Sequence, residues 1–553
     1  MNTKKLVSLL LTGLMGTGAA QAAIFHCGTA QDLQTALSLS ASDGQDDTIY
    51  LAAGIYYGNF TFNSSESQAL TLSPETNAQP GQVVLSGTLS INSGSANANL
   101  AIQQMTVQNG GLTLTTAGTV TFSQCTFQNC SGGGNGGAFT VTGASTFNCV
   151  NTLVSGNSSG GCWNCGGGWV TSVGQAVVTG CTFTGNNING GWWYGGTPMT
   201  ASAIFIQANS ITFTGNNASA NTGTCGSGYL SGAVYLQASS VTVSGNTFQG
   251  NTTSGGGAGL YLSGGPALLT NCRFVGNSSG QAGGGVNLSC SSILCQGNTF
   301  LNNSASSGGA IQCGENSAAV LADNLVVSNS ASSSGGGIYI NSAPTNYVVN
   351  NTIFGNSAQN GGGLYYNPQS GSLNYVDNNI IWGNTASSSG GDVFIVTGGT
   401  LRSLYNNDYH SMAGLWDVAV NNIDVAPLFV DQLRGNYRLR ANSLCINAGN
   451  NSAPGLPLVD LDGNTRIADD TVDIGAFEQS ASDWHPADVN TNWTIEPSEF
   501  AAYASAWTNH AAWSTGPNPI PIDYVTRAGF LVQTNGGNYQ NVGGGKPLNW
   551  QPR

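Results

Sequence analysis

The segment Asp488–Glu499 has the clearest potential for chemistry in this sequence. Oxygen-bearing side chains occupy its positions 1, 3, 5, 9 and 12, namely Asp488, Asn490, Asn492, Glu496 and Glu499, and position 7 would add the carbonyl of Thr494. This spacing is typical of a loop that binds Ca²⁺ through oxygen ligands, with Glu499 binding through both carboxylate oxygens. We therefore predict a calcium site followed by a helix over residues 500–507. The alternative is an acidic helix cap without a metal.

Position 6 of the same loop departs from the usual pattern. A glycine normally stands there because the backbone takes a left-handed conformation, but this chain has Trp493. A bulky residue makes that conformation costly.

Between residues 100 and 400 the chain is almost free of ionisable groups: it has Arg273, Glu315, Asp323, Asp377 and Asp392, and no histidine. A glycosidase needs two facing carboxylates, and a pectate-type lyase needs basic residues or a calcium cluster. Asp323 and Asp377 lie two repeats apart, which is about 10 Å at the spacing of stacked strands. This exceeds the usual range for an inverting pair. We expect both residues to cap turns, with catalysis by the pair as the alternative.

The repeats are marked by an asparagine that follows an apolar residue. It recurs at Asn129, Asn157, Asn186, Asn216, Asn251, Asn277, Asn303, Asn329, Asn356 and Asn384. After each comes an apolar residue that opens a β-type run: Phe139, Trp169, Ile204, Val234, Leu260, Val286, Ile311, Ile338, Leu364 and Val393. From Asn251 to Asn329 the period is 26 residues.

A short period with β-branched, Gly-rich and Ser-rich runs predicts an all-β fold, a β-solenoid with one coil per repeat. Strands of successive coils would lie about 4.8 Å apart and stack their apolar residues into one core. The repeated asparagines would form a ladder, because a tight corner leaves backbone groups that need partners. We assign these residues to structure rather than to catalysis.

Two repeats carry insertions. The gap from asparagine to the next apolar residue is 18 residues at Asn186–Ile204 and at Asn216–Val234, against eight or nine in later repeats. The first insertion contains Trp192, Trp193 and Tyr194, and the preceding repeat has Trp163 at the equivalent corner. Exposed rings there would suit a sugar face or a protein partner. The alternative is that the rings fold down over their own loops.

The ends of the chain differ from the repeats. Residues 1–22 combine Lys4, Lys5, an apolar stretch and Ala20-Gln21-Ala22, which is typical of a secretory signal peptide. We expect an N-terminal cap with a short helix and the first coils at 23–99, a body at 100–400 and closing coils at 401–480. A partly helical calcium-loop module should follow at 483–553. No later stretch is apolar enough to span a membrane.

Charge and cysteine content limit the function further. Loss of Lys4 and Lys5 takes the formal charge from −14 to −16, so the mature protein should repel nucleic acid. Thirteen cysteines are present, and an exported chain can form disulfides. For Cys149, Cys272, Cys290, Cys295 and Cys313, disulfides and buried thiols both stay open. For Cys162 and Cys165 we expect a local disulfide.

The elements Phe300-Leu301-Asn302-Asn303 and Gly308-Gly309-Ala310-Ile311 resemble repeats of the polymorphic outer membrane proteins and other right-handed parallel β-helix proteins of the pectate-lyase-like superfamily. The resemblance implies a right-handed β-helix and a surface protein over roughly residues 30–400.

Residues 424–478, with Asp460-Leu461-Asp462-Gly463-Asn464 and Asp473-Ile474-Gly475-Ala476-Phe477-Glu478, look like the closing segment of choice-of-anchor β-helix proteins. The loop Asp488–Glu499 is similar to a dockerin-type calcium loop, present here in one clear copy. These resemblances imply an exported body joined to a C-terminal attachment module with a possible partner in the cell envelope.

The expected function is that of a secreted or cell-surface adhesin or structural binding protein. Its ligand would be a glycan or a cell-surface protein. The alternative is a polysaccharide lyase or glycosidase that acts on an extracellular glycan.

Overall fold

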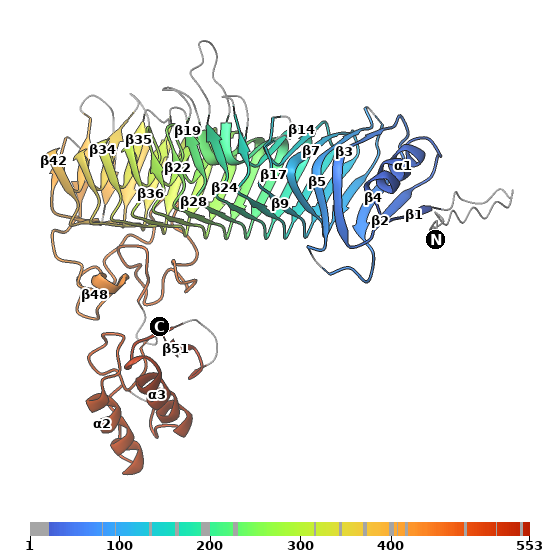
Figure 1. The fold of residues 1–553 in the computed structure, drawn as a ribbon. Helices are drawn as coiled ribbons and strands as arrows, with labels where there is room; N and C mark the ends of the chain where they lie inside the picture. Colours follow the sequence, from blue (N-terminus) through green and yellow to red (C-terminus); the bar gives the residue numbers. More distant parts are fainter. Residues whose placement is uncertain are drawn as a thin grey trace.

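The computed structural model describes residues 22–79, 81–94, 96–131, 135–160, 165–189, 200–224, 231–314, 317–341, 345–368, 373–396, 403–405, 407–414, 419–479, 484–515, 517–541 and 546–552. These residues form a long parallel β-solenoid, a closing segment along one side of it, and a small module with two helices (Figure 1). The predicted all-β fold with a partly helical C-terminal module is confirmed.

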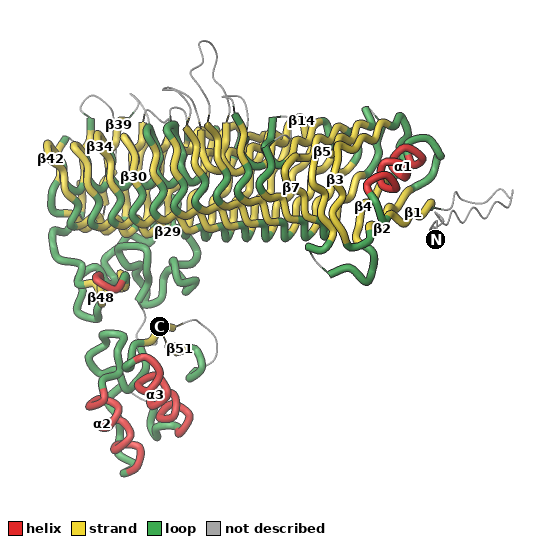
Figure 2. The backbone as a smooth tube through the Cα atoms, in the orientation of Figure 1, coloured by secondary structure: helices red, strands yellow, loops and turns green. Residues whose placement is uncertain are grey.

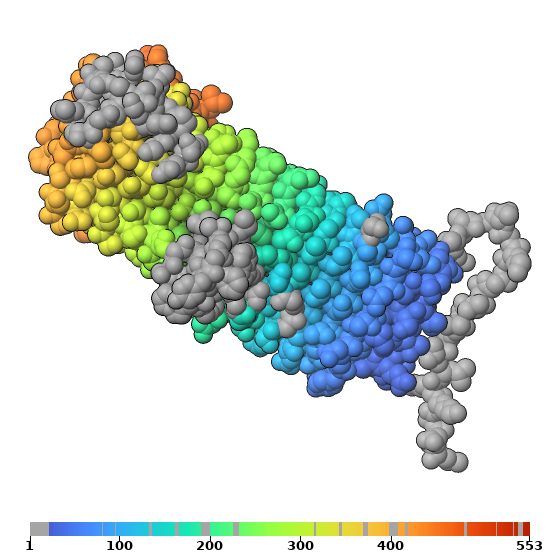
Figure 3. All heavy atoms as spheres, turned by 90° about the horizontal axis from the view of Figure 1, so that it is seen from above, coloured from blue at the N-terminus to red at the C-terminus, as the bar shows by residue number. Residues whose placement is uncertain are grey.

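A single coil shows how the solenoid is built. Residues 286–307 form four short strands, β27 (Val286–Cys290), β28 (Ser292–Gln296), β29 (Thr299–Leu301) and β30 (Ser304–Ser307). Each strand pairs in parallel with the corresponding strand of the next coil, for example Val286 with Ile311 and Phe300 with Val326. The order of the coils along the rod follows the sequence, as the succession of colours in Figure 3 shows.

The strands fall into columns along the rod. The first column contains β10 (Phe139–Thr142), β23 (Leu260–Gly264), β27, β31 (Ile311–Cys313), β35 (Ile338–Asn341), β39 (Leu364–Asn367), β43 (Val393–Ile395) and β46 (Met412–Ala413). The second contains β1 (Ala23–Cys27), β2 (Asp47–Leu51), β4 (Leu70–Pro74), β6 (Leu100–Gln103), β8 (Thr119–Ser123), β11 (Thr146–Val150), β24 (Ala267–Thr270), β28, β32 (Ala318–Ala322), β36 (Thr345–Val349), β40 (Leu373–Asp377), β44 (Ser403–Tyr405) and β47 (Ala419–Val420). Three long strands, β14 (Gly168–Thr179), β17 (Thr200–Thr214) and β20 (Ser231–Ser244), run through both columns.

The third column contains β9 (Thr126–Gln128), β12 (Leu153–Ser155), β15 (Thr182–Thr184), β18 (Asn217–Ser219), β21 (Thr247–Gln249), β25 (Arg273–Val275), β29, β33 (Leu325–Val327), β37 (Thr352–Phe354), β41 (Ile380–Trp382) and β45 (Asp408–Tyr409). In the first coils this column is occupied by the long strands β3 (Gly54–Asn63), β5 (Val83–Asn92) and β7 (Thr106–Thr115). The fourth column is a separate sheet of β13 (Ser158–Ser159), β16 (Asn187–Asn189), β19 (Thr222–Thr224), β22 (Thr252–Thr253), β26 (Ser278–Ser279), β30, β34 (Ser330–Ser334), β38 (Ser357–Asn360) and β42 (Thr385–Ser389).

The core consists of inward side chains that stack from coil to coil. Val286, Ile311 and Ile338 follow one another in register and are fully buried. In the third column the rings of Phe248, Phe274 and Phe300 stack with centroids 4.6 and 4.7 Å apart. Because each ring packs on the ring above and below, apolar burial is continuous along the rod.

The predicted asparagine ladder is present, and its members are fully hydrogen-bonded. Asn303 is representative: its Nδ2 donates to the Phe274 carbonyl at 3.0 Å and to Asn329 Oδ1 at 2.9 Å. Its Oδ1 accepts from both nitrogens of Asn277. The same pattern links Asn157, Asn186, Asn221, Asn251, Asn277, Asn303, Asn329, Asn356 and Asn384. At the end, Asp392 Oδ1 accepts from Asn384 Nδ2 at 2.9 Å.

Two ladder assignments from sequence are wrong. Asn216 belongs to a second ladder, where its Nδ2 donates to Asn246 Oδ1, and Asn221 takes the place assigned to it. At the first repeat the ladder position is Cys130, whose N–H donates to Asn157 Oδ1, while Asn129 occupies a left-handed corner with φ 53°. The first error arises because the two ladders run five residues apart, so spacing alone confuses them. The second arises because Asn129 directly precedes the ladder position, which a cysteine occupies.

A register error also affects Trp169. Phe139 pairs with Gly168, and Thr140 with Trp169, so Trp169 lies on the outward face and Gly168 holds the inward position. A Cβ on Gly168 would lie 2.3 Å from the Phe139 ring. The large Phe139 side chain therefore fills the space of two inward residues.

The N-terminal end of the rod is covered by helix α1 (Ala30–Ser40), seen at the right of Figure 1. Thr29 and Asp32 form a capping box, and Leu33, Ala36 and Leu37 are buried against the first coils. The short helix and the neighbouring strands match the expectation from sequence. A helix in this place shields the first strand edge.

The closing segment lies along the side of the last coils, and the C-terminal module lies beyond it (Figures 1 and 2). The closing segment has a hairpin of β48 (Phe429–Asp431) and β49 (Asn436–Leu439) with the 3₁₀ helix η1 (Gln432–Arg434) between them. The module has α2 (Pro497–Thr508), α3 (Ile522–Asn535), β50 (Tyr539–Asn541) and β51 (Trp550–Pro552). Among the described helices, none is long and apolar enough to cross a membrane.

We predict that Asn303→Ala lowers the free energy of unfolding by roughly 2–4 kcal/mol, because it leaves two buried backbone groups of the preceding coil, the Asn277 N–H and the Phe274 carbonyl, without this partner. Asn217→Ala, an exposed strand position, is the control and should change it little. Urea denaturation of the full chain measures both. Equal effects would contradict a stabilising role for the ladder.

Candidate functional site

The predicted calcium loop closes around the carboxylate of Asp488. Asp488 is buried, and its Oδ2 accepts from the Tyr539 hydroxyl at 2.7 Å and the Trp493 N–H at 2.9 Å. Its Oδ1 accepts from the Asn492 N–H at 3.1 Å. Burial nevertheless raises the pKa of Asp488 to about 6. The Asp488 carboxylate is thus held both by its own loop and by Tyr539 near the end of the module.

The last residue of the loop, Glu499, joins the loop to helix α2. Its Oε1 accepts from the N–H groups of Val489 and Asn490 at 3.0 and 3.2 Å, and its Oε2 accepts from the Glu496 N–H at 3.1 Å. The bond from the Glu496 N–H is one half of a capping box at the start of α2, and in the other half the Glu496 side chain accepts from the Glu499 N–H. The helix begins three residues before the predicted segment. The capping role that the sequence left open is therefore present.

The other predicted calcium ligands gather around Glu496. Asn492 Nδ2 donates to Glu496 Oε1 at 2.8 Å, and Asn490 Nδ2 donates to Glu496 Oε2 at 3.2 Å. Burial and the neighbouring Glu496 raise the pKa of Glu499 to about 7. Two carboxyl groups so close together favour a cation between them. Over the described part of the chain, no three His, Cys, Asp or Glu side chains form a ready metal site.

The donor set fits Ca²⁺, provided the two amides turn their oxygens inward. Asp488, Asn490, Asn492, Glu496 and Glu499 are all oxygen donors, as a hard cation requires. The predicted backbone ligand, Thr494, lies in the same loop, where its N–H bonds to Asn492 Oδ1 and its hydroxyl to Asn538. Rotation of the Asn490 and Asn492 amides would turn their oxygens, in place of their NH₂ groups, towards Glu496. This would add two oxygen ligands without moving the backbone.

Trp493 adopts the left-handed conformation in spite of its size, with φ 62°. Its ring is 4% exposed and packs near Tyr539 and Trp484, with centroid distances of 5.5 and 6.3 Å. The Arg438 guanidinium of the closing segment lies 5.7 Å from the ring centroid. The left-handed backbone costs about 1–2 kcal/mol, and burial of a large apolar side chain offsets it by about 1.5–3 kcal/mol. Position 6 therefore connects the loop to the closing segment.

The aromatic residues predicted for binding, Trp163, Trp192, Trp193 and Tyr194, lie outside the described residues. The strands beside these loops carry an outward column of rings, Trp169, Phe205, Tyr235 and Tyr261, with successive centroids 4.5, 5.1 and 4.7 Å apart. Phe205, Tyr235 and Tyr261 are buried. This column was not predicted from the sequence, because Trp169 was assigned to the inward face; the alternation of inward and outward residues along each strand would have revealed it.

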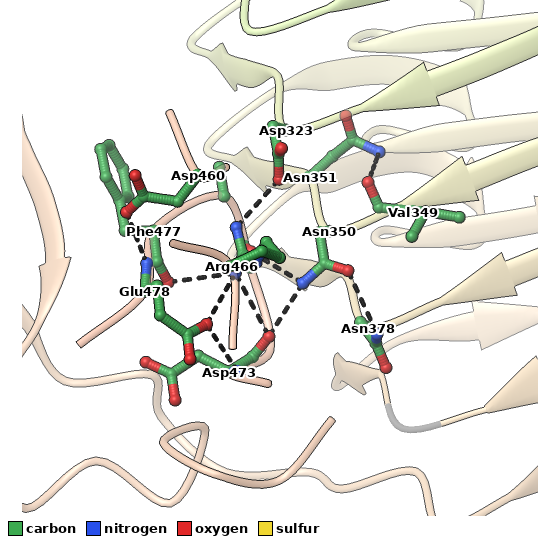
Figure 4. A network of polar contacts seen from close by, with 12 residues as sticks. Asp323, Val349, Asn350, Asn351, Asn378, Asp460, Arg466, Asp473, Phe477 and Glu478 are labelled. Atoms are coloured by element: carbon green, nitrogen blue, oxygen red, sulfur yellow. Dashed lines mark hydrogen bonds and ion pairs between the residues drawn. The ribbon is translucent and has the colours of Figure 1, made fainter. Parts of the chain in front are cut away.

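Asp323 is not part of an open catalytic pair and does not cap a turn through its side chain. It is 1% exposed, and its Oδ1 accepts from Arg466 Nη1 at 2.9 Å (Figure 4). Arg466 comes from the closing segment and is equally buried. The sequence signals on the two sides, an Asp at a coil corner and an Arg beside Asp460–Asn464, gave no indication that they pair across 143 positions.

Arg466 is surrounded by acidic side chains of its own segment. Its Nη2 lies 3.4 Å from Glu478 Oε2 and donates to the carbonyl of Gly475 at 2.9 Å. Glu478 in turn accepts from the N–H groups of Ala468 and Asp473. Asp460 and Asp473 accept backbone N–H groups nearby, including those of Glu478 and Gln479. One guanidinium thus holds a group of buried acids and links them to the body.

The pKa values of these acids are raised. Burial raises the pKa of Asp323 well above its usual range, in spite of Arg466. Burial and the nearby Asp473 raise the pKa of Glu478 to about 8, and burial raises that of Asp473 to about 6. One arginine does not neutralise all of them, so part of the group is protonated at neutral pH.

The other two described acids of the body are also buried. Asp377 is 1% exposed and lies in β40, which pairs with β36 and β44. Asp392 ends the asparagine ladder with Oδ1, and its Oδ2 accepts from the N–H groups of His410 and Ser411. Neither carboxylate is available to a substrate.

The eleven cysteines in the described part of the chain are free and buried. They fill core positions, as one of the two alternatives proposed, and the disulfide predicted between Cys162 and Cys165 is not formed, since Cys165 is a free thiol. Burial raises the pKa of Cys165 to about 12. Thiols with such pKa values are unreactive.

Comparison with protein families gives one match. A family model described as "Right handed beta helix region" matches residues 231–409. This agrees with the parallel coils and with the predicted handedness. No curated protein matches the sequence. The similarity therefore concerns the fold of the body, and the closing segment and C-terminal module lie largely outside it.

We predict that docking of the closing segment weakens as pH rises from about 5 to 8. A carboxyl whose pKa is raised by folding holds more protons in the folded chain, so stability falls as pH passes from its unfolded pKa towards its folded pKa. For Glu478, which faces Arg466 and Asp473, this range ends at about pH 8. Hydrogen exchange of residues 468–479 should therefore accelerate over this range beyond the intrinsic effect of pH.

Glu478→Gln should reduce this additional pH dependence, because an amide does not titrate. Asp470→Asn is the control: it removes an exposed carboxylate of the same segment at a left-handed position that asparagine accepts. An unchanged pH profile in Glu478→Gln would contradict the assignment.

Proposed function

We propose that this protein is an exported, non-catalytic β-helix protein that acts at the cell surface as an adhesin or structural binding protein. The rod carries and spaces the binding surfaces, and the C-terminal module, stabilised by calcium, serves attachment. The ligand is a glycan or a surface protein.

The burial of the acids in the body is the observation that supports this proposal best. Asp323, Asp377 and Asp392 are each 1% exposed, and Asp323 and Asp392 form structural contacts. The described part of the body therefore offers no facing pair of accessible carboxylates, which a glycosidase requires. Its single arginine, Arg273, also makes a lyase site on the body difficult, since such a site needs several cationic groups or a calcium cluster.

The export part of the proposal depends on the N-terminal sequence. Lys4, Lys5, the apolar stretch and Ala20-Gln21-Ala22 have the pattern of a signal peptide. The neutral, hydroxyl-rich and amide-rich surface of the coils agrees with a molecule that works in contact with glycans.

Calcium would connect the module to the body. When bound, Ca²⁺ would neutralise Asp488, Glu496 and Glu499 and hold the loop that carries Trp493. Because the Trp493 ring lies against the closing segment, an ordered loop would also favour one orientation of the module.

Calcium should stabilise the full chain, and this effect should be lost in Glu499→Gln. At a calcium concentration one hundred times Kd, a single site adds about 2.7 kcal/mol to the stability of the folded state. Thermal unfolding of the C-terminal module, followed by tryptophan fluorescence with calcium and with chelator, measures the difference. Glu75→Gln, in the first coils, is the control. Equal melting of the unaltered chain in both conditions would contradict the site.

Purified full-length protein should retain ligands from a glycan panel without cleaving them. Neither reducing ends nor unsaturated products should appear, because the buried acids do not reach a substrate. Turnover that disappears in Asp323→Asn or Asp377→Asn would overturn the non-catalytic assignment and favour a lyase or glycosidase.

A further inference from the structure

A large cleft lies where the hairpin of the closing segment meets the side of the body. It has a volume of about 930 Å³, and its walls include Arg273 and Thr299 from the coils and Arg434, Tyr437 and Arg438 from the hairpin. The walls therefore come from two parts of the chain that are far apart in sequence, residues 271–354 of the coils and residues 432–477 of the closing segment.

A second cleft adjoins the first on the other side of the hairpin. It has a volume of about 500 Å³ and lies between the closing segment and the calcium loop, with Arg434, Arg440, Asp431 and Trp493 among its walls. Arg434 lines both clefts.

The clefts concentrate positive charge in a strongly acidic protein. Arg273, Arg434, Arg438 and Arg440 line them, against the carboxylates Asp431 and Asp462, while the whole chain has a formal charge of −14. A local excess of cations in such a chain indicates a place where an anion is attracted.

Arg273 is the most informative of these residues. Its register neighbours in the third column are Thr247 and Thr299, so an arginine interrupts a threonine column at the cleft. It is exposed, and over the described residues no carboxylate lies within ion-pair distance of it. Its charge does not stabilise the coil and is free for a ligand.

The hairpin supplies one largely buried cation, Arg438, and one exposed cation, Arg434. Arg438 is held by Asp462 and stacks over Phe477 at 5.1 Å, and its side chain is 12% exposed. Arg434 is 79% exposed and pairs only with Asp431 through one nitrogen at 3.2 Å. Beside it, Leu433 is 93% exposed at the mouth of the cleft. An arginine in such an exposed pair can exchange its partner for a ligand at little cost.

We propose that this cleft binds a saccharide that carries an acidic group, either carboxylate, phosphate or sulfate. The arginines take the acidic group by charge-assisted hydrogen bonds. The half-buried ring of Phe354 offers an apolar face for a sugar, and Asn271, Asn302 and Thr299 offer partners for its hydroxyls. This specifies a ligand class for the binding role proposed above and rests on that role.

The test is calorimetric titration of the full chain with oligosaccharides of equal length: a neutral one, a uronate, a phosphorylated one and a sulfated one. At least one acidic oligosaccharide should bind, and the neutral one should bind at least tenfold more weakly at low salt. Binding should weaken at 0.5 M salt, where the Debye length falls to about 4 Å. The comparison among acidic groups distinguishes a uronic polysaccharide from a phosphorylated or sulfated one.

Arg273→Thr is the decisive variant, because threonine is the residue of the neighbouring coils. It should raise Kd for the acidic ligand about tenfold, which corresponds to about 1.4 kcal/mol. Arg434→Gln should act in the same direction. Lys546→Gln, which removes the same charge from an exposed position in the C-terminal module, is the control and should leave Kd unchanged.

If Arg273→Thr bound the acidic ligand as tightly as the unaltered chain does, the cleft would be ruled out as the binding site. Absence of binding by every acidic oligosaccharide would also overturn the inference. Retention of a neutral glycan in that case would preserve the proposed binding function, whereas retention of no glycan and no surface protein would contradict both.

Discussion

The fold depends on one requirement: the backbone amide and carbonyl groups at every buried corner need hydrogen-bond partners in a neighbouring coil. At each corner the backbone turns away from its strand and exposes amide and carbonyl groups inside the rod. An asparagine side chain satisfies both kinds of group. Its Oδ1 accepts from N–H groups of the preceding coil, and its Nδ2 donates to a carbonyl of that coil and to the next asparagine of the ladder. The chain begins this arrangement with Cys130 and ends it with Asp392, which needs only to accept.

Because asparagine amides supply the hydrogen bonds at the corners, the body needs few charged side chains. Its few acids serve as structural partners, and the cation that matters most for its contact with the closing segment, Arg466, comes from that segment. Two junctions between parts of the molecule are made by arginines of the closing segment: Arg466 forms a buried ion pair with the coils, and Arg438 lies over the ring of Trp493 of the module. The predicted calcium loop and the arginine-lined clefts lie near these junctions.

Sequence predicted the fold well because stacking repeats a local pattern. The apolar columns, the ladder and the N-terminal helix all follow from periodicity and capping signals. It failed where two similar patterns overlap, as for Asn216 and Asn221, and where a small residue hides the register, as for Gly168 and Trp169. It could not pair Asp323 with Arg466, because that contact depends on how a distant segment folds back. The calcium ligands proposed in Asp488–Glu499 were chosen from spacing alone, whereas spacing gave no sign of the contact between Trp493 and the closing segment.

The closing segment contacts the coils from the side. Its polar contacts fall on Asp323, Asn350, Thr352 and Asn378, all in the last coils of the rod. Duplication or loss of a coil nearer the N-terminus would therefore change the length of the protein by about 4.8 Å without altering this junction. The number of coils, and with it the length of the rod, can therefore vary during evolution near the N-terminus, while the junction with the closing segment stays unchanged.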